Sequence, residues 1–301
     1  MPGVGDYDEF GFLEDNMREW GIAVHPVTVR RAFAAVEGLR HVSALVWGDA
    51  APELALLHGS AQNAHSFDSV ALALDRPLVA LDLPHHGHSD ASPVGPFAPL
   101  EHAADVAAAL AQLTTPPLPM VAMSYGGLVA ITLAHLHPEL LSAIVLVDIT
   151  PGVSVNSAQH IIDFIQGPES FESFDEILER TMRFNPERSE SSLRRGILHN
   201  ALQRPDGSWV WRHQRHGAPS LRPDPDLHLW DWLEDADLPV TLVRAMGPSS
   251  VVSDEDVDEF IRRRPQDQVI EVPGASHSVQ GSHPLELAQI IERVLFGETP
   301  A

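Results

Sequence analysis

The stretch Ala122-Met123-Ser124-Tyr125-Gly126-Gly127 joins an apolar run, 119–123, to a run with helical character, 125–137. Its small residues allow a sharp strand-to-helix turn, because a larger side chain beside the serine would clash with the returning backbone. Such a turn presents the Ser124 hydroxyl, and the first amides of the following helix face any negative charge that develops beside it. The stretch predicts a nucleophilic serine, although similar strings also occur in ordinary strand-to-helix connections.

Apolar runs recur along the chain and alternate with helical patterns. The expected strands are 54–57, 77–81, 119–123, 143–147, 239–244 and 268–272, preceded by an antiparallel pair at 27–36 and 42–47. Continuous apolar runs are typical of a parallel sheet that helices cover on both faces. We therefore predict an α/β fold with a mostly parallel, doubly wound sheet. Ligand sites in such sheets lie at the carboxyl ends of the strands. Four polar residues follow strands directly: His58, Asp82, Ser124 and Asp148.

The alternation stops at residues 151–237. Helical patterns occupy 157–166, 174–184 and 191–203, and a stretch rich in tryptophan and proline follows. An insertion of this length between two strands predicts a helical cap over the strand ends, placed after the sixth strand. The expected domains are an N-terminal appendage (1–23), an α/β core (24–150 and 238–301) and the cap (151–237).

The composition excludes several classes of protein. The 301 residues carry a formal net charge of −23 and include no lysine, so the chain should repel nucleic acids and anionic membranes. Cysteine is absent, which excludes disulfides, a catalytic thiol and thiolate metal ligands. No apolar run is long enough to span a membrane, and the N-terminus is acidic rather than basic. We expect a cytoplasmic protein with a small-molecule substrate, and the oligomeric state stays open.

A serine hydroxyl needs a neighbouring base that removes its proton, and that base needs a group that fixes its tautomer. The base candidate is His277, in the loop Pro273-Gly274-Ala275-Ser276-His277-Ser278 that follows the last expected strand. A histidine in this loop can lean over the neighbouring strand ends. The chain has 17 histidines, so its position rather than its residue type singles out His277.

These motifs and their order, serine then aspartate then histidine, resemble the α/β-hydrolase fold superfamily. The resemblance is to its capped branch of esterases, cofactor-free haloperoxidases and carbon–carbon bond hydrolases, and it covers about residues 24–296. It rests on the His58-Gly59 turn, the turn from Asp82 to Asp90, the Ser124 turn and the His277 loop. Two positions depart from the usual pattern, since Ala122 and His85 each stand where a glycine is expected.

The histidines of the Asp82 turn have two interpretations. His85, His86 and His88, together with Asp82, would suit a zinc ion, because imidazoles in a loop bind zinc. The same residues also fit a structural turn at the end of the strand. The resemblance favours the turn, and we expect neither a metal nor a bound cofactor.

The acidic partner of His277 has two candidates. Many capped hydrolases place it after the seventh strand, where this chain has serine and then Asp254. Asp254, however, also fits the start of a helix, where an acidic residue is favoured. Asp148 ends the strand after the serine helix, a place that some branches of the superfamily use for the acid. We favour Asp148 and keep Asp254 as the alternative.

The resemblance implies a serine hydrolase that cleaves a small, mostly apolar ester, lactone or thioester through an acyl-enzyme. The oxyanion hole would be formed by the backbone amides of Ser60 and Tyr125. A carbon–carbon bond hydrolase, a cofactor-free perhydrolase and a non-catalytic ligand-binding protein are the alternatives, because all three exist on this fold. Epoxide hydrolases and dehalogenases are disfavoured, since their nucleophile is an aspartate and not a serine.

Overall fold

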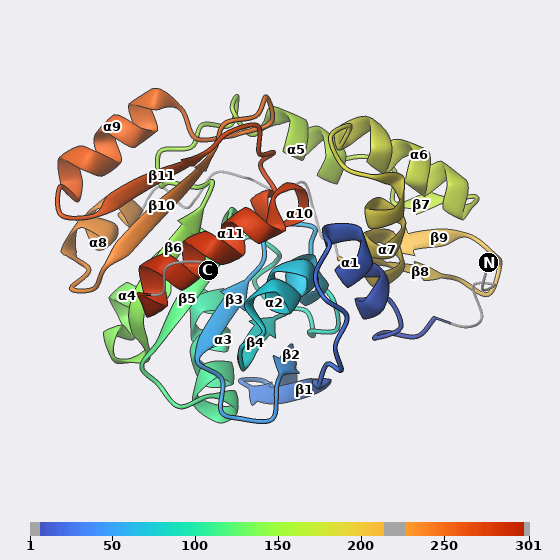
Figure 1. The fold of residues 1–301 in the computed structure, drawn as a ribbon, viewed down its shortest axis with the longest axis horizontal. Helices are drawn as coiled ribbons and strands as arrows, with labels where there is room; N and C mark the ends of the chain where they lie inside the picture. Colours follow the sequence, from blue (N-terminus) through green and yellow to red (C-terminus); the bar gives the residue numbers. More distant parts are fainter. Residues whose placement is uncertain (1–6, 214–226, 298–301) are drawn as a thin grey trace.

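The expected strands assemble into an eight-stranded sheet in the order β1-β2-β4-β3-β5-β6-β10-β11 (Figure 1). The structure is a computed structural model and describes residues 7–213 and 227–297. The strands are β1 (Val29–Val36), β2 (Arg40–Trp47), β3 (Leu54–Leu57), β4 (Leu78–Leu81), β5 (Leu118–Met123), β6 (Leu141–Val147), β10 (Val240–Ala245) and β11 (Gln268–Val272). β2 pairs antiparallel with β1 and β4, and the pairs from β4 to β11 are parallel. The predicted fold class is therefore confirmed.

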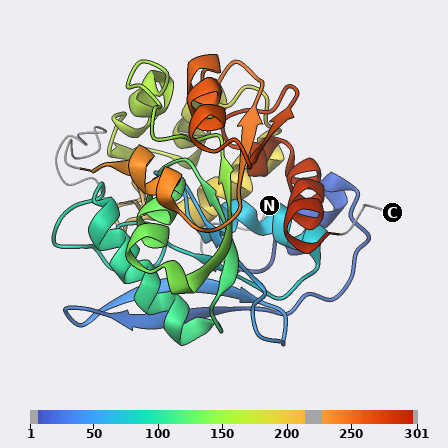
Figure 2. The same cartoon turned by 90° about the vertical axis from the view of Figure 1, so that its left-hand side faces the viewer.

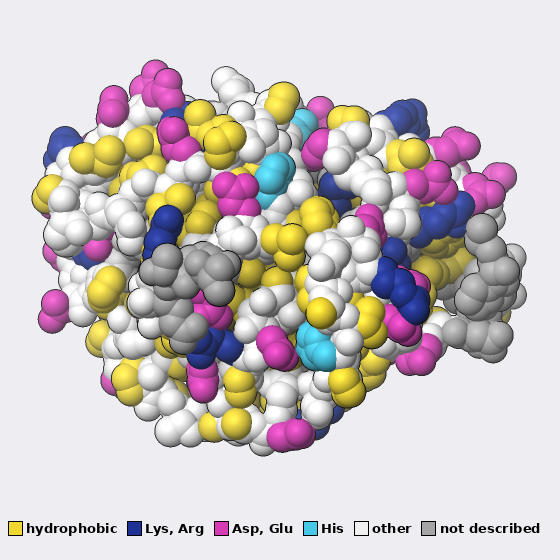
Figure 3. Space-filling view, in the orientation of Figure 1, with side chains coloured by type: hydrophobic (Ala, Val, Ile, Leu, Met, Phe, Trp, Pro, Cys, Tyr) yellow, Lys and Arg dark blue, Asp and Glu magenta, His cyan; other side chains and the backbone are white. Residues whose placement is uncertain are grey.

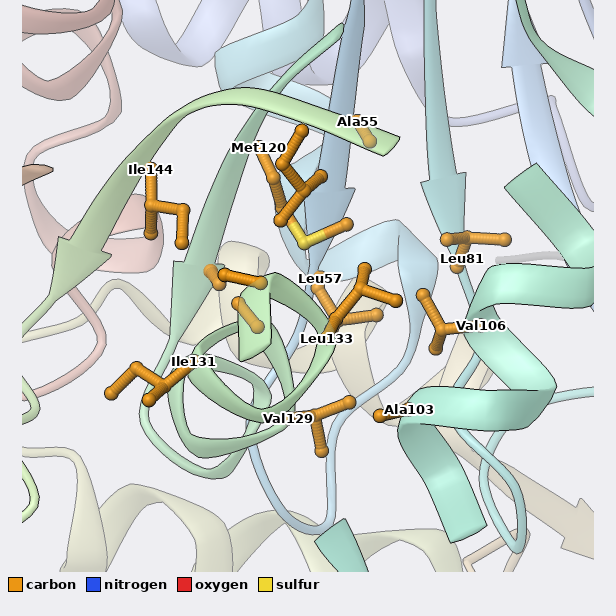
Figure 4. Packing of buried hydrophobic residues seen from close by; sticks show 14 of the residues in the cluster. Ala55, Leu57, Leu81, Ala103, Val106, Met120, Val129, Ile131, Leu133 and Ile144 are labelled. Atoms are coloured by element: carbon orange, nitrogen blue, oxygen red, sulfur yellow. The ribbon is translucent and has the colours of Figure 1, made fainter. Parts of the chain in front are cut away.

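The central strands are buried on both faces, as their continuous apolar sequences predict. In β3, Ala55 and Leu57 belong to the core on one face, while Leu54 and Leu56 belong to the core on the other. Figure 4 shows the first of these cores, where side chains of β3, β4 and β5 meet those of two helices. Because both faces are buried, successive residues of these strands are all apolar, and the strands lack the apolar–polar alternation of a half-exposed sheet.

Helices cover both faces of the sheet (Figures 1 and 2). One face carries α3 (Pro99–Leu113), α4 (Tyr125–Leu136), α8 (Leu229–Asp235) and α9 (Asp254–Arg263). The other carries α1 (Leu13–Trp20), α2 (Asp68–Leu74) and α11 (Pro284–Ile291), with a π-helical turn Glu292–Phe296 after α11. The sequence patterns missed α2, α8 and the short α10 (Val279–Ser282). All three have fewer than three turns, too short to show a clear helical period.

The segment between β6 and α8 forms a separate apolar cluster. Its elements are α5 (Gln159–Ile165), β7 (Ser170–Phe171), α6 (Phe174–Phe184), α7 (Glu190–Asn200), β8 (Ala201–Gln203) and β9 (Trp209–Trp211). The three strands form a small antiparallel sheet in the order β7-β9-β8. The expected helix 191–203 was wrong at its end, because Ala201–Gln203 turns into a strand that pairs with β9. Residues 214–226 lie outside the described part of the chain.

The tryptophans of the stretch rich in tryptophan and proline, Trp209, Trp211, Trp230 and Trp232, separate in the structure. Trp209 is buried in the inserted cluster, whereas Trp230 and Trp232 lie on α8, which packs on the core beside α4. Among the described residues, no helix is long and apolar enough to cross a membrane. Figure 3 shows acidic and basic side chains interspersed over one face.

Candidate active site

The strand-to-helix turn at Ser124 is sharp, as its sequence predicted, and its backbone is strained. Ser124 has φ 51° and ψ −125°, a conformation that L-residues rarely adopt, between the end of β5 and the start of α4. A Cβ on Gly126 would lie 2.5 Å from the carbonyl oxygen of His58, and one on Gly59 would lie 2.9 Å from the Cβ of Ser124. The turn is therefore pressed against the end of β3, and only glycine fits at these two positions.

The structure brings three of the predicted residues into one hydrogen-bonded chain. The Oγ of Ser124 lies 3.0 Å from Nε2 of His277, and Nδ1 of His277 lies 2.8 Å from Oδ2 of Asp148. Since a carboxylate only accepts hydrogen bonds, Nδ1 carries the imidazole proton and Nε2 is left to accept the proton of the serine. Ser124 and Asp148 directly follow the neighbouring strands β5 and β6, and His277 lies in the loop after β11, so all the side chains meet at one edge of the sheet.

The carboxylate of Asp148 is held in place by other donors as well as by His277. Its Oδ1 accepts hydrogen bonds from the amide of Ala245 at 3.0 Å and from the hydroxyl of Ser250 at 2.7 Å. Its Oδ2 also accepts from the amide of Val251 at 3.0 Å. Asp148 is fully buried and has φ 47°. Including His277, four donors fix both oxygens of the carboxylate. The carboxylate in turn holds the imidazole of His277 in its orientation.

Asp254, the alternative acid, lies elsewhere. Its side chain is 85% exposed and pairs with Arg244 at 2.6 Å. The expectation that Asp254 caps a helix was close but off by one residue, because the N-cap of α9 is Ser253, in a capping box with Asp256. Of the serines that stand where the acid was expected after the seventh strand, Ser250 donates to Asp148 and Ser249 accepts from the amide of His277.

The two expected oxyanion donors belong to segments next to the serine. Tyr125 is the first residue of α4, and Ser60 follows the Gly59 backbone that touches Ser124. Ser60 lines the same cavity as Ser124 and His277. The phenol of Tyr125 points away from this cavity and donates to Nδ1 of His102 at 2.7 Å, so only its backbone is available there.

The histidines of the β3 and β4 turns bond to backbone. Nε2 of His58 accepts from the amide of Leu83 at 2.9 Å, and Nε2 of His86 accepts from the amide of Ala61 at 3.0 Å. Burial lowers the pKa of both imidazoles, which keeps them neutral. Nε2 of His85 accepts from the amide of Ser92 at 3.0 Å. These contacts fit the structural-turn interpretation.

Asp82, the fourth residue of the zinc interpretation, has other partners. It pairs with Arg31 at 2.8 Å and accepts from the amides of Ala64 and His88. In the described ranges, the group that could hold a metal is instead His65, Asp68 and His199. There, Nδ1 of His65 already lies 2.9 Å from Asp68.

A cavity of about 190 Å³ opens beside Ser124 and His277. Its apolar walls include Met123, Ile161, Phe164, Phe184 and Trp211, most of them from the inserted segment. It also contains His160 and Arg188, which the sequence patterns did not single out. Neither belongs to a motif, and only the packing of the inserted segment over the strand ends brings them there.

Comparisons with known proteins agree on one family. A sequence model described as "Alpha/beta hydrolase family" matches residues 54–290. The chain is 36% identical over 296 residues to Esterase Rv0045c of Mycobacterium tuberculosis, covering 96% of each protein. It is 27% identical over 259 residues to sn-1-specific diacylglycerol lipase ABHD11 of Danio rerio, covering 81% of this chain and 78% of that protein.

Solved structures give the same result. The Mycobacterium tuberculosis esterase Rv0045c, in a structure described with its transition metal inhibition, has a TM-score of 0.81 and 35% identity, covering 96% of this chain and 99% of that one. E-2-(acetamidomethylene)succinate hydrolase has a TM-score of 0.78 at 23% identity, covering 91% and 100%. At this lower identity the likeness shows the fold alone.

Proposed function

Because this chain belongs to the alpha/beta hydrolase family and is a serine ester hydrolase, we propose that Ser124, His277 and Asp148 carry its reaction. The observation that supports this assignment is the hydrogen-bonded chain from Ser124 Oγ through His277 to the buried Asp148. Each residue lies where an acyl transfer needs it. The hydroxyl contacts the accepting nitrogen, and the other nitrogen is fixed by a carboxylate.

In the proposed mechanism, Nε2 of His277 takes the proton of Ser124 as Oγ attacks the ester carbonyl carbon. The carbonyl oxygen becomes an oxyanion, which the amides of Ser60 and Tyr125 stabilise. His277 then protonates the leaving alcohol, and an acyl-enzyme on Ser124 remains. Water, deprotonated by His277, attacks this intermediate and releases the acid. Throughout the cycle, Asp148 stabilises the imidazolium and keeps its Nδ1 proton in place.

The substrate we propose is a small, mostly apolar ester. The aromatic and aliphatic side chains of the cavity favour apolar groups, and its volume of about 190 Å³ limits their size. We also propose that residues 151–237 act as a cap, because α5, α6 and α7 contribute walls of this cavity. A cytoplasmic location stays a prediction from the sequence, which cell fractionation would check.

Labelling with a fluorophosphonate tests the nucleophile. Intact-mass measurement on the wild type should find one adduct, and Ser124→Ala should carry none, because the reagent requires an activated serine. The same two proteins are then assayed on short-chain acyl esters, where only the wild type should turn over. A well-folded wild type that takes up no label would contradict the proposed role of Ser124.

A further inference from the structure

Arg188 is a cation that lines the cavity and forms no ion pair with any residue that the structure describes. It lies in the connection between α6 and α7 and lines the same cavity as Ser124 and His277. Its Nη2 donates to the hydroxyl of Ser192 at 2.7 Å. Its Nε is enclosed and has no hydrogen-bond partner, and no carboxylate among the described residues lies within ion-pair distance of it.

The nearby acidic side chains do not neutralise this guanidinium. Glu19 is bonded to Arg195, Ser189 and Ser191. Glu187 is exposed at the rim of the same cavity and attracts Arg188 without forming an ion pair with it. Arg195, the other arginine of the cavity, is by contrast paired with Glu19 and donates from Nε to Asn16 at 2.7 Å. Of these two arginines, only Arg188 has an enclosed donor without a hydrogen-bond partner.

Arg188 is also held close to the catalytic loop. A Cβ on Gly281 would lie 3.0 Å from Cζ of Arg188, so the guanidinium packs flat against the backbone of α10, which begins just after His277 and Ser278. Burial lowers the pKa of Arg188 to about 10. The group therefore stays charged at neutral pH, in surroundings that disfavour an uncompensated charge.

A buried cation with unused donors is stabilised by an anion that enters the same cavity. We propose that Arg188 binds an anionic group at one end of the substrate, so that the enzyme prefers esters that carry a carboxylate, such as the monoesters of dicarboxylic acids. The apolar walls then hold the methylene chain between the scissile ester and this carboxylate. This inference rests on the proposed function and names the substrate class within it.

The test compares matched esters. The wild type is assayed by pH-stat on monomethyl succinate, glutarate, adipate and suberate, and on the uncharged methyl hexanoate. We expect one of the monoesters to exceed methyl hexanoate in kcat/KM. The quantity compared is the ratio of kcat/KM for the best monoester to kcat/KM for methyl hexanoate. Arg188→Met should lower this ratio by about 30-fold, which is typical of a lost charge-assisted hydrogen bond. Arg188→Lys should lower it by less, because lysine keeps the charge.

The control is Arg194→Met. Arg194 is on α7 but pairs with Glu190 outside the cavity, so its replacement should leave the ratio unchanged. If Arg188 only stabilised the fold, its replacement would change kcat/KM equally for both kinds of ester and leave the ratio unchanged. An unchanged ratio in Arg188→Met, or a wild type that prefers methyl hexanoate to every monoester, overturns the inference.

A binding measurement separates this inference from the proposed function. Monomethyl adipate is titrated calorimetrically into Ser124→Ala and into Ser124→Ala/Arg188→Met. Binding to the first and at least about tenfold weaker binding to the second support the anion site, even when the wild type hydrolyses none of the esters. Equal binding to both variants overturns the anion site, while hydrolysis of methyl hexanoate by the wild type still supports the proposed function.

Discussion

At the scale of single residues, the position of Asp148 separates two hypotheses that the sequence left open. Asp148 contacts His277 and is fixed by three further donors, whereas Asp254 is exposed and pairs with Arg244. We expect Asp148→Asn to lower kcat by about 10³- to 10⁴-fold, because an amide at this position no longer fixes the Nδ1–H tautomer of His277. Steady-state kinetics on a short-chain ester measures this change.

Asp254→Asn is the matched control, since it removes the same charge from a site that does not touch His277. Its kcat should stay within about twofold of the wild type, as surface substitutions usually have small effects. Circular dichroism shows whether both variants are folded. A loss of turnover in Asp254→Asn and not in Asp148→Asn would reverse the assignment of the acid.

The sequence could place Ser124, His277 and Asp148 because each follows a strand, and strand ends meet at one edge of a parallel sheet. It could not identify Arg188 or the group of His65, Asp68 and His199. These residues come from segments distant in sequence, and their contacts depend on how the inserted segment and the N-terminal segment pack. Neither residue type nor spacing carries that information.

At the scale of elements, the strands were predictable because their burial leaves a continuous apolar signal. β3 and β11 begin and end where the sequence patterns placed them. The small sheet β7-β9-β8 was not predictable, since its strands have two or three residues and are defined by their pairing. Short elements are specified by tertiary contacts more than by local sequence.

The turn between β5 and α4 gives a test of the packing that holds the site. A Cβ on Gly126 would lie 2.5 Å from the carbonyl oxygen of His58 and 2.7 Å from that of Leu57. Because both contacts are to backbone, neither can move aside easily. Gly126→Ala should lower the free energy of unfolding by about 3 kcal/mol. Urea denaturation followed by circular dichroism measures this loss.

Gly196→Ala provides the contrast. Gly196 lies inside α7, and a Cβ there would meet nothing within 4 Å. Alanine favours the helix more than glycine does, so this variant should be more stable by about 0.5–1 kcal/mol. If the two substitutions changed the unfolding free energy by the same amount, the close approach of β3 to the turn would not be what requires glycine at position 126.

At the scale of the whole molecule, one buried polar network joins three distant parts of the chain. Arg31 on β1 pairs with Asp82 after β4 and with Glu9 of the N-terminal segment. His65 lies between Glu9 and Asp68, at 3.2 and 2.9 Å, and stacks on His199 of the inserted segment at a ring distance of 3.7 Å. The network therefore links the N-terminal segment and the inserted segment to the sheet.

The charge state of His65 makes this network depend on pH. Burial disfavours the imidazolium, but the contacts with Asp68 and Glu9 outweigh it and raise the pKa of His65 to about 9. The stability that a raised pKa contributes is complete below the unfolded value near 6.5 and is lost as pH rises through about 9. For Glu9, burial is outweighed by His65 and Arg31, which lower its pKa to about 2, so its contribution is lost only in acid, below about 4.5.

We therefore expect the unfolding free energy of the wild type, relative to that of His65→Gln, to fall between pH 6.5 and 9 by on the order of 2–3 kcal/mol. His65→Gln should be less stable than the wild type at pH 6.5 and approach it at pH 9, because glutamine does not titrate. Buried histidines with a lowered pKa, such as His58 and His86, titrate near pH 6.5 in the unfolded chain and raise stability with pH in both proteins, so the comparison with His65→Gln isolates the effect of His65. The control is His228→Gln. The side chain of His228 is 69% exposed, so this variant should keep the pH dependence of the wild type.

Urea denaturation at intervals of half a pH unit measures the unfolding free energy of the three proteins. A difference between wild type and His65→Gln that is the same at pH 6.5 and 9 would mean that His65 does not hold its proton through this network.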